Sequence, residues 1–391
     1  MGWDIAPAFA LCIAWGIVWA RIRLKRASIG PLPADRPEPA KPPLVSVIVA
    51  AKEEQEHIQE TIRHIMRQTY ARMEIIAVND RSNDATGAKL EALKAWSADR
   101  PGDGPPLKVI HVTSLPEGWL GKNHALYQGY LQAKGTYLLF TDADVRFEPN
   151  TVRDTVSFAL EERADHVTLL PKLIAGRFWL RAFVHYFLFS LCLFLPPWLG
   201  NDDRQRKRGI GVGAFNFIRR DAYEAIGTHR AFRMRPDDDL RLGMLVKQSG
   251  GRQRVAGGAD RIAVEWYPTL TAAAVGLEKN LYAGFAYRLP AALAAAAAQL
   301  LCFVLPLTAP IWSRGPALGL WLMADVFLVL SYLSLVRAFN GERGTEALAL
   351  PVSALMLVTI LLRSVFLAHR NKGVYWRGTF YSLDELKRRF S

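Results

Sequence analysis

The sequence VSVIVAA, residues 45–51, is a nearly unbroken run of apolar and β-branched residues, followed directly by Lys52 and Glu53. Such a run is typical of a strand that is buried on both faces of a parallel sheet. Outward from it, short apolar runs alternate with helical patterns. Strands are expected at 45–51, 74–78, 107–112, 136–141 and 166–170, and helices at 58–67, 86–96, 123–133 and 152–162. This alternation predicts the α/β class, with a mostly parallel, doubly wound sheet.

Composition and charge limit the class of protein. The chain has 391 residues, a formal net charge of +13, 51% hydrophobic residues and 22% charged residues. This mixture excludes a disordered chain, which lacks apolar residues, and a fully embedded membrane protein, which could not accommodate so many charges. The three cysteines lie in separate apolar runs, so neither a disulfide framework nor a structural zinc site is expected. No nucleic-acid recognition motif accompanies the basic charge, so we expect no nucleic-acid partner.

Five apolar runs hold much of the hydrophobic content. Ile5–Ala20 is followed by basic residues, which indicates an uncleaved anchor whose C-terminal end lies in the cytoplasm, rather than a signal peptide. Three runs near the C-terminus are long enough to cross a membrane: 289–313, 315–336 and 347–368. The run 182–201 falls inside the α/β domain, so we expect it to lie in the membrane plane.

These runs predict the domain organisation. We expect a membrane anchor at 1–26, a Pro-rich linker at 27–43, an α/β domain at 44–275, transmembrane helices at 276–368 and a basic tail at 369–391. The protein is then a multi-pass protein of the cell (inner) membrane with its α/β domain in the cytoplasm. Three spans after that domain would place the basic tail outside, against the positive-inside rule, so one segment is expected to be re-entrant or interfacial. Asp325 and Arg363 either pair between the last two helices, or Arg363 extends to the membrane surface.

Polar residues follow three of the predicted strands. Ligands of doubly wound sheets bind beyond the carboxyl ends of the strands, so chemistry is expected at Lys52 and Glu53, at Asp80, and at Asp142 with Asp144. Two carboxylates separated by one residue could hold a divalent cation from one side, although ordinary turn chemistry explains the pair equally well. Asp80 could reach a base or a ribose, or could only stabilise its turn.

Two glycine-containing segments could approach a ligand. Lys122 stands in LPEGWLGKN, residues 115–123, and a Gly-flanked lysine before a helix suits a diphosphate. Trp119 in the same segment could instead anchor the domain at the membrane interface. The segment GIGVGAF, residues 209–215, would let the backbone approach a ligand closely, although a bulged edge strand explains its glycines too.

Three successive carboxylates, Asp237, Asp238 and Asp239, open a predicted helix. Negative charge at a helix start complements the helix dipole. Because capping needs only one or two carboxylates, the surplus indicates a site.

The order of these motifs resembles that of the family 2 glycosyltransferases, whose catalytic domain has the nucleotide-sugar-binding GT-A fold. The resemblance runs from about Val45 to Tyr267. It rests on VSVIVAAKEE (45–54), VNDRSND (78–84), GWLGKNHAL (118–126), TDADV (141–145), GVGAFNFIRR (211–220) and DDDLRLG (237–243). It extends loosely to ceramide glucosyltransferase-like enzymes and to bacterial enzymes that glycosylate carotenoid or hopanoid lipids.

The resemblance implies a role for each candidate residue. Asp239 would be the catalytic base and Asp238 its neighbour, because family members place an acidic pair immediately before such a helix. Asp144, with Asp142, would hold Mg²⁺ or Mn²⁺. The implied nucleotide-sugar contacts are Ala50, Lys52, Glu53, Asp80, Lys122 and Asp142, and the implied acceptor-side residues are Gly211, Gly213 and Trp119.

Two departures from the family pattern refine the expected function. Asn79 replaces the usual first Asp of its turn, so Asp80 carries that motif alone. The Gln-x-x-Arg-Trp motif of processive polysaccharide synthases is absent, and residues 276–282 read GLEKNLY. The resemblance therefore implies an inverting hexosyltransferase that moves one sugar, most simply from a UDP-sugar, to a lipid or isoprenoid acceptor in the membrane. The alternatives are a processive synthase and a non-catalytic nucleotide-sugar sensor or scaffold.

Overall fold

The computed structural model describes residues 4–390 apart from 101, 103 and 377–378; the first three residues of the expected anchor and residues 377–378 and 391 of the expected tail lie outside the described residues. The chain divides into two compact units. We call Ser28–Leu173 with Leu195–Glu265 the sheet unit. We call Met1–Ala27, Ile174–Phe194 and Trp266–Ser391 the helical unit.

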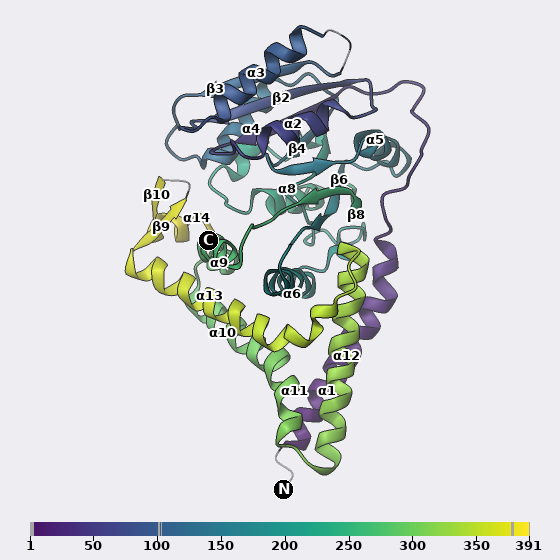
Figure 1. Ribbon diagram of the computed structural model, residues 1–391, viewed down its shortest axis with the longest axis vertical. Helices are drawn as coiled ribbons and strands as arrows, with labels where there is room; N and C mark the ends of the chain where they lie inside the picture. The colour runs from purple at the N-terminus through teal and green to yellow at the C-terminus, as the bar shows by residue number, and fades with distance from the viewer. Residues whose placement is uncertain (1–3, 101, 103, 377–378, 391) are drawn as a thin grey trace. The chain divides into compact units, whose positions relative to one another are not determined.

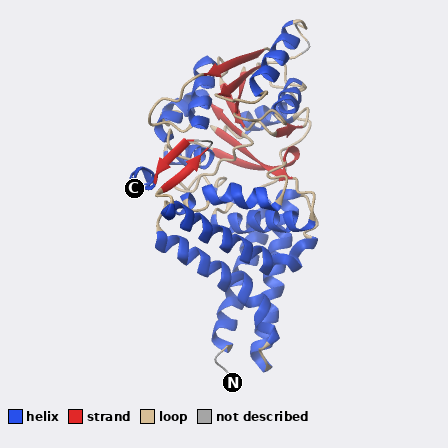
Figure 2. Ribbon diagram, turned by 60° about the vertical axis from the view of Figure 1, so that its left-hand side comes forward, coloured by secondary structure: helices blue, strands red, loops and turns tan. Residues whose placement is uncertain are grey.

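The sheet unit is built on an eight-stranded sheet in the order β3-β2-β1-β4-β7-β6-β8-β5 (Figures 1 and 2). The strands are β1 (Val45–Ala51), β2 (Met73–Asp80), β3 (Leu107–Val112), β4 (Tyr137–Thr141), β5 (Val145–Phe147), β6 (His166–Leu173), β7 (Asn216–Arg219) and β8 (Gln253–Val264). β3, β2, β1 and β4 are parallel, whereas β7 is antiparallel to both of its neighbours. The predicted α/β class and mostly parallel sheet are confirmed.

Helices cover this sheet because its central strands are apolar on both faces. The helices of the unit are α2 (Ile58–Met66), α3 (Thr86–Ala98), α4 (Gly121–Gln132), α5 (Thr151–Glu161), α7 (Arg220–Ala225) and α8 (Asp238–Gln248), with the 3₁₀ turns η2 (Pro197–Leu199) and η3 (His229–Phe232). In β1, Val47 and Val49 belong to one hydrophobic core and Ile48 and Ala50 to another. Alternate residues of a strand point to opposite faces, so the unbroken apolar run of β1 supplies both cores.

The parallel strands end at one edge of the sheet. Ala51 at the end of β1 pairs with Asn79, and Val49 pairs with Thr141 at the end of β4. The polar residues that follow β1, β2 and β4 therefore lie at a common edge, as the sequence predicts.

The Pro-rich segment at 27–43 lies along the sheet unit. Leu32 N donates to Gly257 O at 2.8 Å, and Tyr70 Oη donates to Pro43 O at 2.6 Å. Ser157 Oγ also donates to Pro37 O at 3.0 Å. The expected linker is thus attached to the sheet unit at several points.

The glycines of 209–213 lie in a loop before β7, and β7 is an inner strand. The alternative of a bulged edge strand is therefore wrong. A Cβ at Gly211 would lie 2.0 Å from Asp239 O, and one at Gly209 would lie 2.1 Å from Gly243 O. These glycines are required because the loop packs directly on the backbone of α8.

The helical unit contains α1 (Ile5–Lys25), α6 (Phe178–Phe194), α9 (Leu270–Asn280), α10 (Leu289–Gln299), α11 (Leu305–Thr308), α12 (Gly315–Asn340), α13 (Leu350–Arg370) and α14 (Leu383–Phe390), with a hairpin of β9 (Gly373–Trp376) and β10 (Thr379–Ser382). Among the described residues, four helical segments are long and apolar enough to cross a membrane: Ile5–Ser28, Leu289–Ile311, Gly315–Asn340 and Thr345–Arg370. They coincide with the four predicted runs. α6 is shorter and ends before Pro196, and its position in the membrane plane stays a prediction.

The long helices of this unit have different directions. α1 and α12 lie side by side, whereas α13 runs in a different direction and packs against α6, α9 and α10 (Figure 1). Arg363 on α13 pairs with Glu278, with its Nε 2.5 Å from Glu278 Oε1. The hypothesis that Arg363 pairs with Asp325 is therefore wrong, because a nearer carboxylate on α9 binds the guanidinium. Asp325 Oδ1 is buried and accepts no hydrogen bond from the described residues.

Candidate functional site

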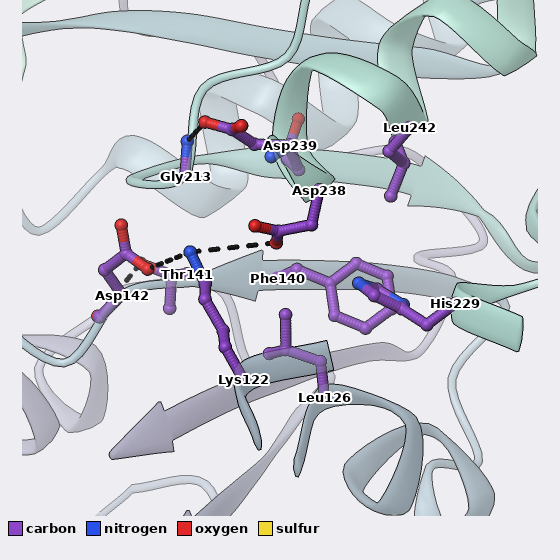
Figure 3. A pocket seen from close by; sticks show the side chains of 11 residues that line it. Lys122, Leu126, Phe140, Thr141, Asp142, Gly213, His229, Asp238, Asp239 and Leu242 are labelled. Carbon is purple, nitrogen blue, oxygen red and sulfur yellow. Dashed lines mark hydrogen bonds and ion pairs between the residues drawn. The ribbon is translucent and has the colours of Figure 1, made fainter. Parts of the chain in front are cut away.

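Lys122 lies at the centre of a pocket at the carboxyl edge of the sheet (Figure 3). It is the second residue of α4, and its Nζ lies 2.7 Å from Asp142 Oδ1 and 3.7 Å from Asp238 Oδ2. Asp142 directly follows β4, and Asp238 is the first residue of α8. The pocket is lined by Lys122, Leu126, Phe140, Thr141, Asp142, Gly213, Asn216, His229, Asp238, Asp239 and Leu242.

The charges around Lys122 do not balance. Burial opposes the charge of Lys122, yet Asp142, Asp238 and Asp239 together raise its pKa. Burial raises the pKa of Asp238 to about 7 against the opposing effect of Lys122, and the neighbouring carboxylates add to the rise. Burial likewise raises the pKa of Asp239. One cation therefore faces three carboxylates, and such a surplus is typical of sites that bind a further cation or move a proton.

The three consecutive carboxylates at the start of α8, the capping residue Asp237 followed by Asp238 and Asp239, have three different environments. Asp237 forms a bidentate pair with Arg235, at 2.9 and 2.7 Å. Asp239 accepts hydrogen bonds from Gly213 N and Leu240 N, both at 2.8 Å. Asp238 points toward Lys122 (Figure 3). Only Asp238 and Asp239 line the pocket, as the predicted register requires, and the choice of Asp239 as the base stays a prediction.

Asp144 lines a second pocket at the same edge. This pocket is lined by His57, Glu60, Thr61, Asp144, Arg146 and Glu265. Burial and the nearby Asp142 raise the pKa of Asp144 to about 6. Asp142 lines the first pocket and Asp144 the second, and the charge of Asp142 raises the cost of ionising Asp144.

The comparisons with known proteins place this site in a family. Residues 46–227 match the sequence profile of Glycosyl transferase family 2. This match covers somewhat less than half of the chain and identifies a family 2 glycosyltransferase domain. This glycosyltransferase domain thus covers β1 to α7 and contains Lys122, Asp142 and Asp144, and the acidic pair of α8 follows shortly after it.

Individual relatives support the same assignment. The chain is 22% identical over 348 residues to 4,4'-diaponeurosporenoate glycosyltransferase of Staphylococcus aureus, across 87% of this chain and 89% of the relative. It is 34% identical over 128 residues to an uncharacterized glycosyltransferase of Haemophilus influenzae, a match that spans only 36% of that protein. Among solved structures, a mannosyltransferase from Pyrobaculum calidifontis in complex with GDP-Man and Mn²⁺ has a TM-score of 0.51 at 16% identity, over 94% of this chain and 99% of that one. This likeness shows the GT-A fold.

A divalent cation fits the carboxylates of this glycosyltransferase. Burial, with the nearby Asp142, raises the pKa of Asp144 to about 6, and the positive charge of a bound cation would offset both effects. The described residues contain no group of three or more metal-ligating side chains, so phosphate oxygens and water would complete the coordination.

The predicted nucleotide contacts of the first strand and its loop differ in burial and in their hydrogen bonds. Ala50 is buried within β1, where it pairs with Val78 of β2. Glu53 has a left-handed backbone, with φ of 55°, and its carboxylate accepts from Asn83 N at 2.9 Å. Glu53 thus stabilises the turn after β2. Lys52 is half-buried next to it.

Asp80, which could reach a base or a ribose or could only stabilise its turn, forms an ion pair with Arg81. Its carboxylate is buried and accepts two hydrogen bonds from Arg81, at 2.7 and 3.1 Å. Asn79, the departure from the family pattern, accepts from Ser82 N at 3.3 Å and so supports the turn.

The predicted acceptor-side residues Gly213 and Trp119 have different neighbours. Gly213 lies between the acids, because a Cβ there would be 2.6 Å from Asp142 Oδ2. Trp119 is half-buried against α4, where its ring stacks on Tyr127 with centroids 5.3 Å apart. Trp119 is thus packed within the sheet unit, against side chains of α4.

Sequence reasoning missed His229 and Arg81. His229 lines the Lys122 pocket, and its Nδ1 lies 2.5 Å from Tyr223 Oη. Burial, with the neighbouring Lys122, lowers the pKa of His229 to about 3, so this wall of the pocket is neutral. No local pattern identifies His229, because its place depends on the packing of η3 beside β4.

Proposed function

We propose that the protein transfers one sugar from a nucleotide-sugar to a lipid or isoprenoid acceptor at the cytoplasmic surface of the cell membrane. The observation that carries the proposal is the surplus of carboxylates around Lys122, at the carboxyl edge of a GT-A sheet. The four apolar helices of the same chain support a membrane-borne acceptor.

The geometry supports different roles for the carboxylates that follow β4 and for the carboxylates that open α8. Asp144 and Asp142 would hold a divalent cation, which when bound neutralises charge on the leaving diphosphate. Lys122 lies beside Asp142 and would stabilise the same oxygens. Asp239, or its neighbour Asp238, would accept the proton of the acceptor hydroxyl at a carboxylate oxygen.

The chemical class of the sugar acceptor decides whether the reaction needs Asp239 or Asp238 as a base. The staphylococcal relatives are named for 4,4'-diaponeurosporenoate, a carboxylate. We propose an apolar acceptor of this general kind for the present chain. A hydroxyl acceptor requires a base, and Asp239→Asn should then lower kcat by about 10²- to 10⁴-fold. A carboxylate acceptor is already ionised, and in that case Asp239→Asn should retain most of the activity.

The arrangement of the helical unit suggests a membrane topology. If α1, Leu289–Ile311 and α12 cross and α13 lies along the interface, the chain after α13 returns to the cytoplasmic side, as its basic residues require. The direction of α13, which differs from that of α1 and α12, supports this arrangement. Asn371→Cys should react with a membrane-impermeant thiol reagent only from the cytoplasmic side, and labelling only from the opposite side would overturn the topology.

A donor panel tests the proposed activity. Purified full-length protein in detergent would be assayed with UDP-glucose, UDP-galactose, UDP-GlcNAc and GDP-mannose, with Mn²⁺ or with EDTA, against a lipid extract as acceptor. We expect one donor to be consumed, EDTA and Asp144→Asn to abolish turnover, and the product mass to rise by a single hexose unit. A ladder of products would support the processive alternative. Tight nucleotide binding without turnover of any donor would support the sensor.

A further inference from the structure

The loop that precedes β7 is held in place by side chains of β6, β7 and β8. Ile210 N donates to Gln253 Oε1 at 2.9 Å, and Gln253 Nε2 donates to Ile210 O at 2.7 Å. Val212 N donates to Thr168 Oγ1 at 3.1 Å, and Asn216 Nδ2 donates to Val212 O at 2.9 Å. Backbone N–H and C=O groups that lie outside helices and strands and away from water need such partners. The path of the loop is therefore set by the polar side chains of three neighbouring strands.

His166 fixes the orientation of the Gln253 amide. Its side chain is fully buried, and burial lowers its pKa to about 4, so the ring is neutral and has one donor and one acceptor nitrogen. Because Gln253 Oε1 faces Ile210 N, the Gln253 Nε2 group donates to His166 Nδ1 at 2.8 Å. His166 Nε2 then donates to Asn216 Oδ1 at 3.0 Å. Each donor in this row meets an acceptor, so this orientation of the two amides satisfies every contact.

The loop before β7 in turn supports α8 and one of its carboxylates. A Cβ at Gly243 of α8 would lie 2.2 Å from Ile210 O and 2.8 Å from Gln253 Nε2. The helix backbone therefore packs directly on the residue that Gln253 holds. Further along the loop, Gly213 N donates to Asp239 Oδ2 at 2.8 Å (Figure 3). The direction of the Asp239 carboxylate thus depends on where the loop places Gly213.

The amide of Gln253 is more than packing of the sheet requires. Gln253 is fully buried in β8, where its register partner in β6 is His166. A buried amide costs free energy unless it is hydrogen-bonded, and an apolar side chain of similar size would fill the same space. What the amide adds is one donor and one acceptor directed at the loop.

We propose that Gln253 is a positioning residue for the reaction: it holds the loop before β7 so that Gly213 N–H orients the Asp239 carboxylate, and His166 orients the Gln253 amide. This inference rests on the proposed function, with Asp239 as the base that accepts the proton of the acceptor hydroxyl. Gln253 is not among the residues that line the Lys122 pocket, so it acts on the reaction through the loop.

Kinetics of the full-length protein in detergent separate positioning from donor binding. Gln253→Glu keeps the shape of the side chain and the acceptor for Ile210 N, but removes the donor to Ile210 O. With the preferred nucleotide-sugar and a lipid extract, we expect kcat to fall about 10- to 100-fold and KM for the donor to stay within about threefold. Gln253→Met, which keeps the volume without adding a charge, should give the same split and replaces the Glu variant if that variant does not fold. Gln248→Glu, at the exposed last residue of α8, is the control and should be silent.

A double-mutant cycle tests whether Gln253 acts through Asp239. If it does, Gln253→Glu lowers kcat in the wild-type background and has little further effect in Asp239→Asn. A full additional loss in Asp239→Asn would show that Gln253 acts elsewhere and would overturn the inference. Unchanged kcat in folded Gln253→Glu would overturn it too, as would nearly full kcat in Asp239→Asn, because no base would then need positioning. In these three cases sugar transfer by the wild-type protein keeps the proposed function, whereas wild-type protein that turns over no donor would overturn both.

Discussion

Two buried charge clusters, one in each unit, differ in how their charges balance. In the sheet unit, Lys122 faces Asp142, Asp238 and Asp239. In the helical unit, Glu346 is almost fully buried, accepts a hydrogen bond from Arg181 Nε and lies 3.4 Å from His185 Nδ1. The first cluster has more carboxylates than cations, whereas the second matches one carboxylate with one guanidinium and an imidazole.

This difference in charge balance indicates a structural role for the Glu346 cluster and a reactive role for the Lys122 cluster. The Glu346 cluster joins α6 to the turn before α13, and His185 also contacts Asn340 at 2.9 Å. Breaking a buried ion pair leaves an uncompensated charge and is strongly destabilising, so we treat this cluster as structural. The Lys122 cluster keeps unneutralised carboxylates at the carboxyl edge of the sheet, where a cation and a diphosphate would complete the balance. The predictions below treat the first as a structural cluster and the second as a reactive one.

The largest effect is expected from removing the cation of the reactive cluster. Lys122→Met should lower kcat/KM at least about 100-fold, because the leaving diphosphate loses a stabilising charge and the carboxylates lose their partner. Steady-state transfer assays with the preferred donor would measure this. Lys108→Met, at an exposed lysine of the same unit, is the control and should be silent. Nearly full activity in Lys122→Met would show that the cluster is structural.

The next effect is a pH dependence of activity. Asp238 has a pKa raised to about 7 by burial, so its folded form binds a proton more tightly than its unfolded form. The contribution of Asp238 to the stability of the sheet unit therefore falls as pH rises from about 4 to 7. Over the same range Asp238 becomes ionised, which is the form that we expect the reaction to need. We expect kcat/KM to be about tenfold lower at pH 6 than at its plateau above pH 8. The profile of Asp238→Asn should lack this limb; an identical limb would assign it to another group.

Breaking the structural cluster should change stability more than chemistry. Glu346→Gln leaves Arg181 and the fully buried His185 without their carboxylate and should destabilise the protein by about 3 kcal/mol. Thermal unfolding in detergent would show the loss, and the folded fraction should keep its rate of transfer within about threefold. Glu278→Gln breaks the pair with the exposed Arg363 and should destabilise less. Loss of activity without loss of stability in Glu346→Gln would place this cluster in the site.

The smallest effect is expected at the edge of the reactive cluster. Asp237 pairs with Arg235 and does not line the pocket, so Asp237→Asn should change kcat/KM by less than about threefold. The same substitution at Asp239 or Asp238 provides the comparison. If Asp237→Asn is the most damaging of the three, the register of the acidic motif is shifted by one residue or more.

The fold and much of the site follow from local sequence. β1, β2 and β4 can be predicted because both of their faces are buried, which makes each a continuous apolar run. Since these strands are parallel, Asp80, Asp142 and Lys52 lie at one edge of the sheet. β7 and β8 escape prediction because the first is only four residues long and the second contains Gly257, Gly258 and several charges. The contacts of Arg81 and His229 escape it too, because they depend on α4 closing over β2 and on η3 packing beside β4, which no short window of sequence records.

Nucleotide binding with and without a divalent metal tests the reactive cluster most directly. It does not depend on the acceptor, and Asp144→Asn provides a matched variant without one of the expected ligands. We expect the preferred nucleoside diphosphate to bind at least about tenfold more tightly with Mn²⁺ than with EDTA, and Asp144→Asn to lose that difference. Equal affinity with Mn²⁺ and with EDTA in the wild-type protein would contradict the assignment of the surplus carboxylates to a metal and diphosphate site.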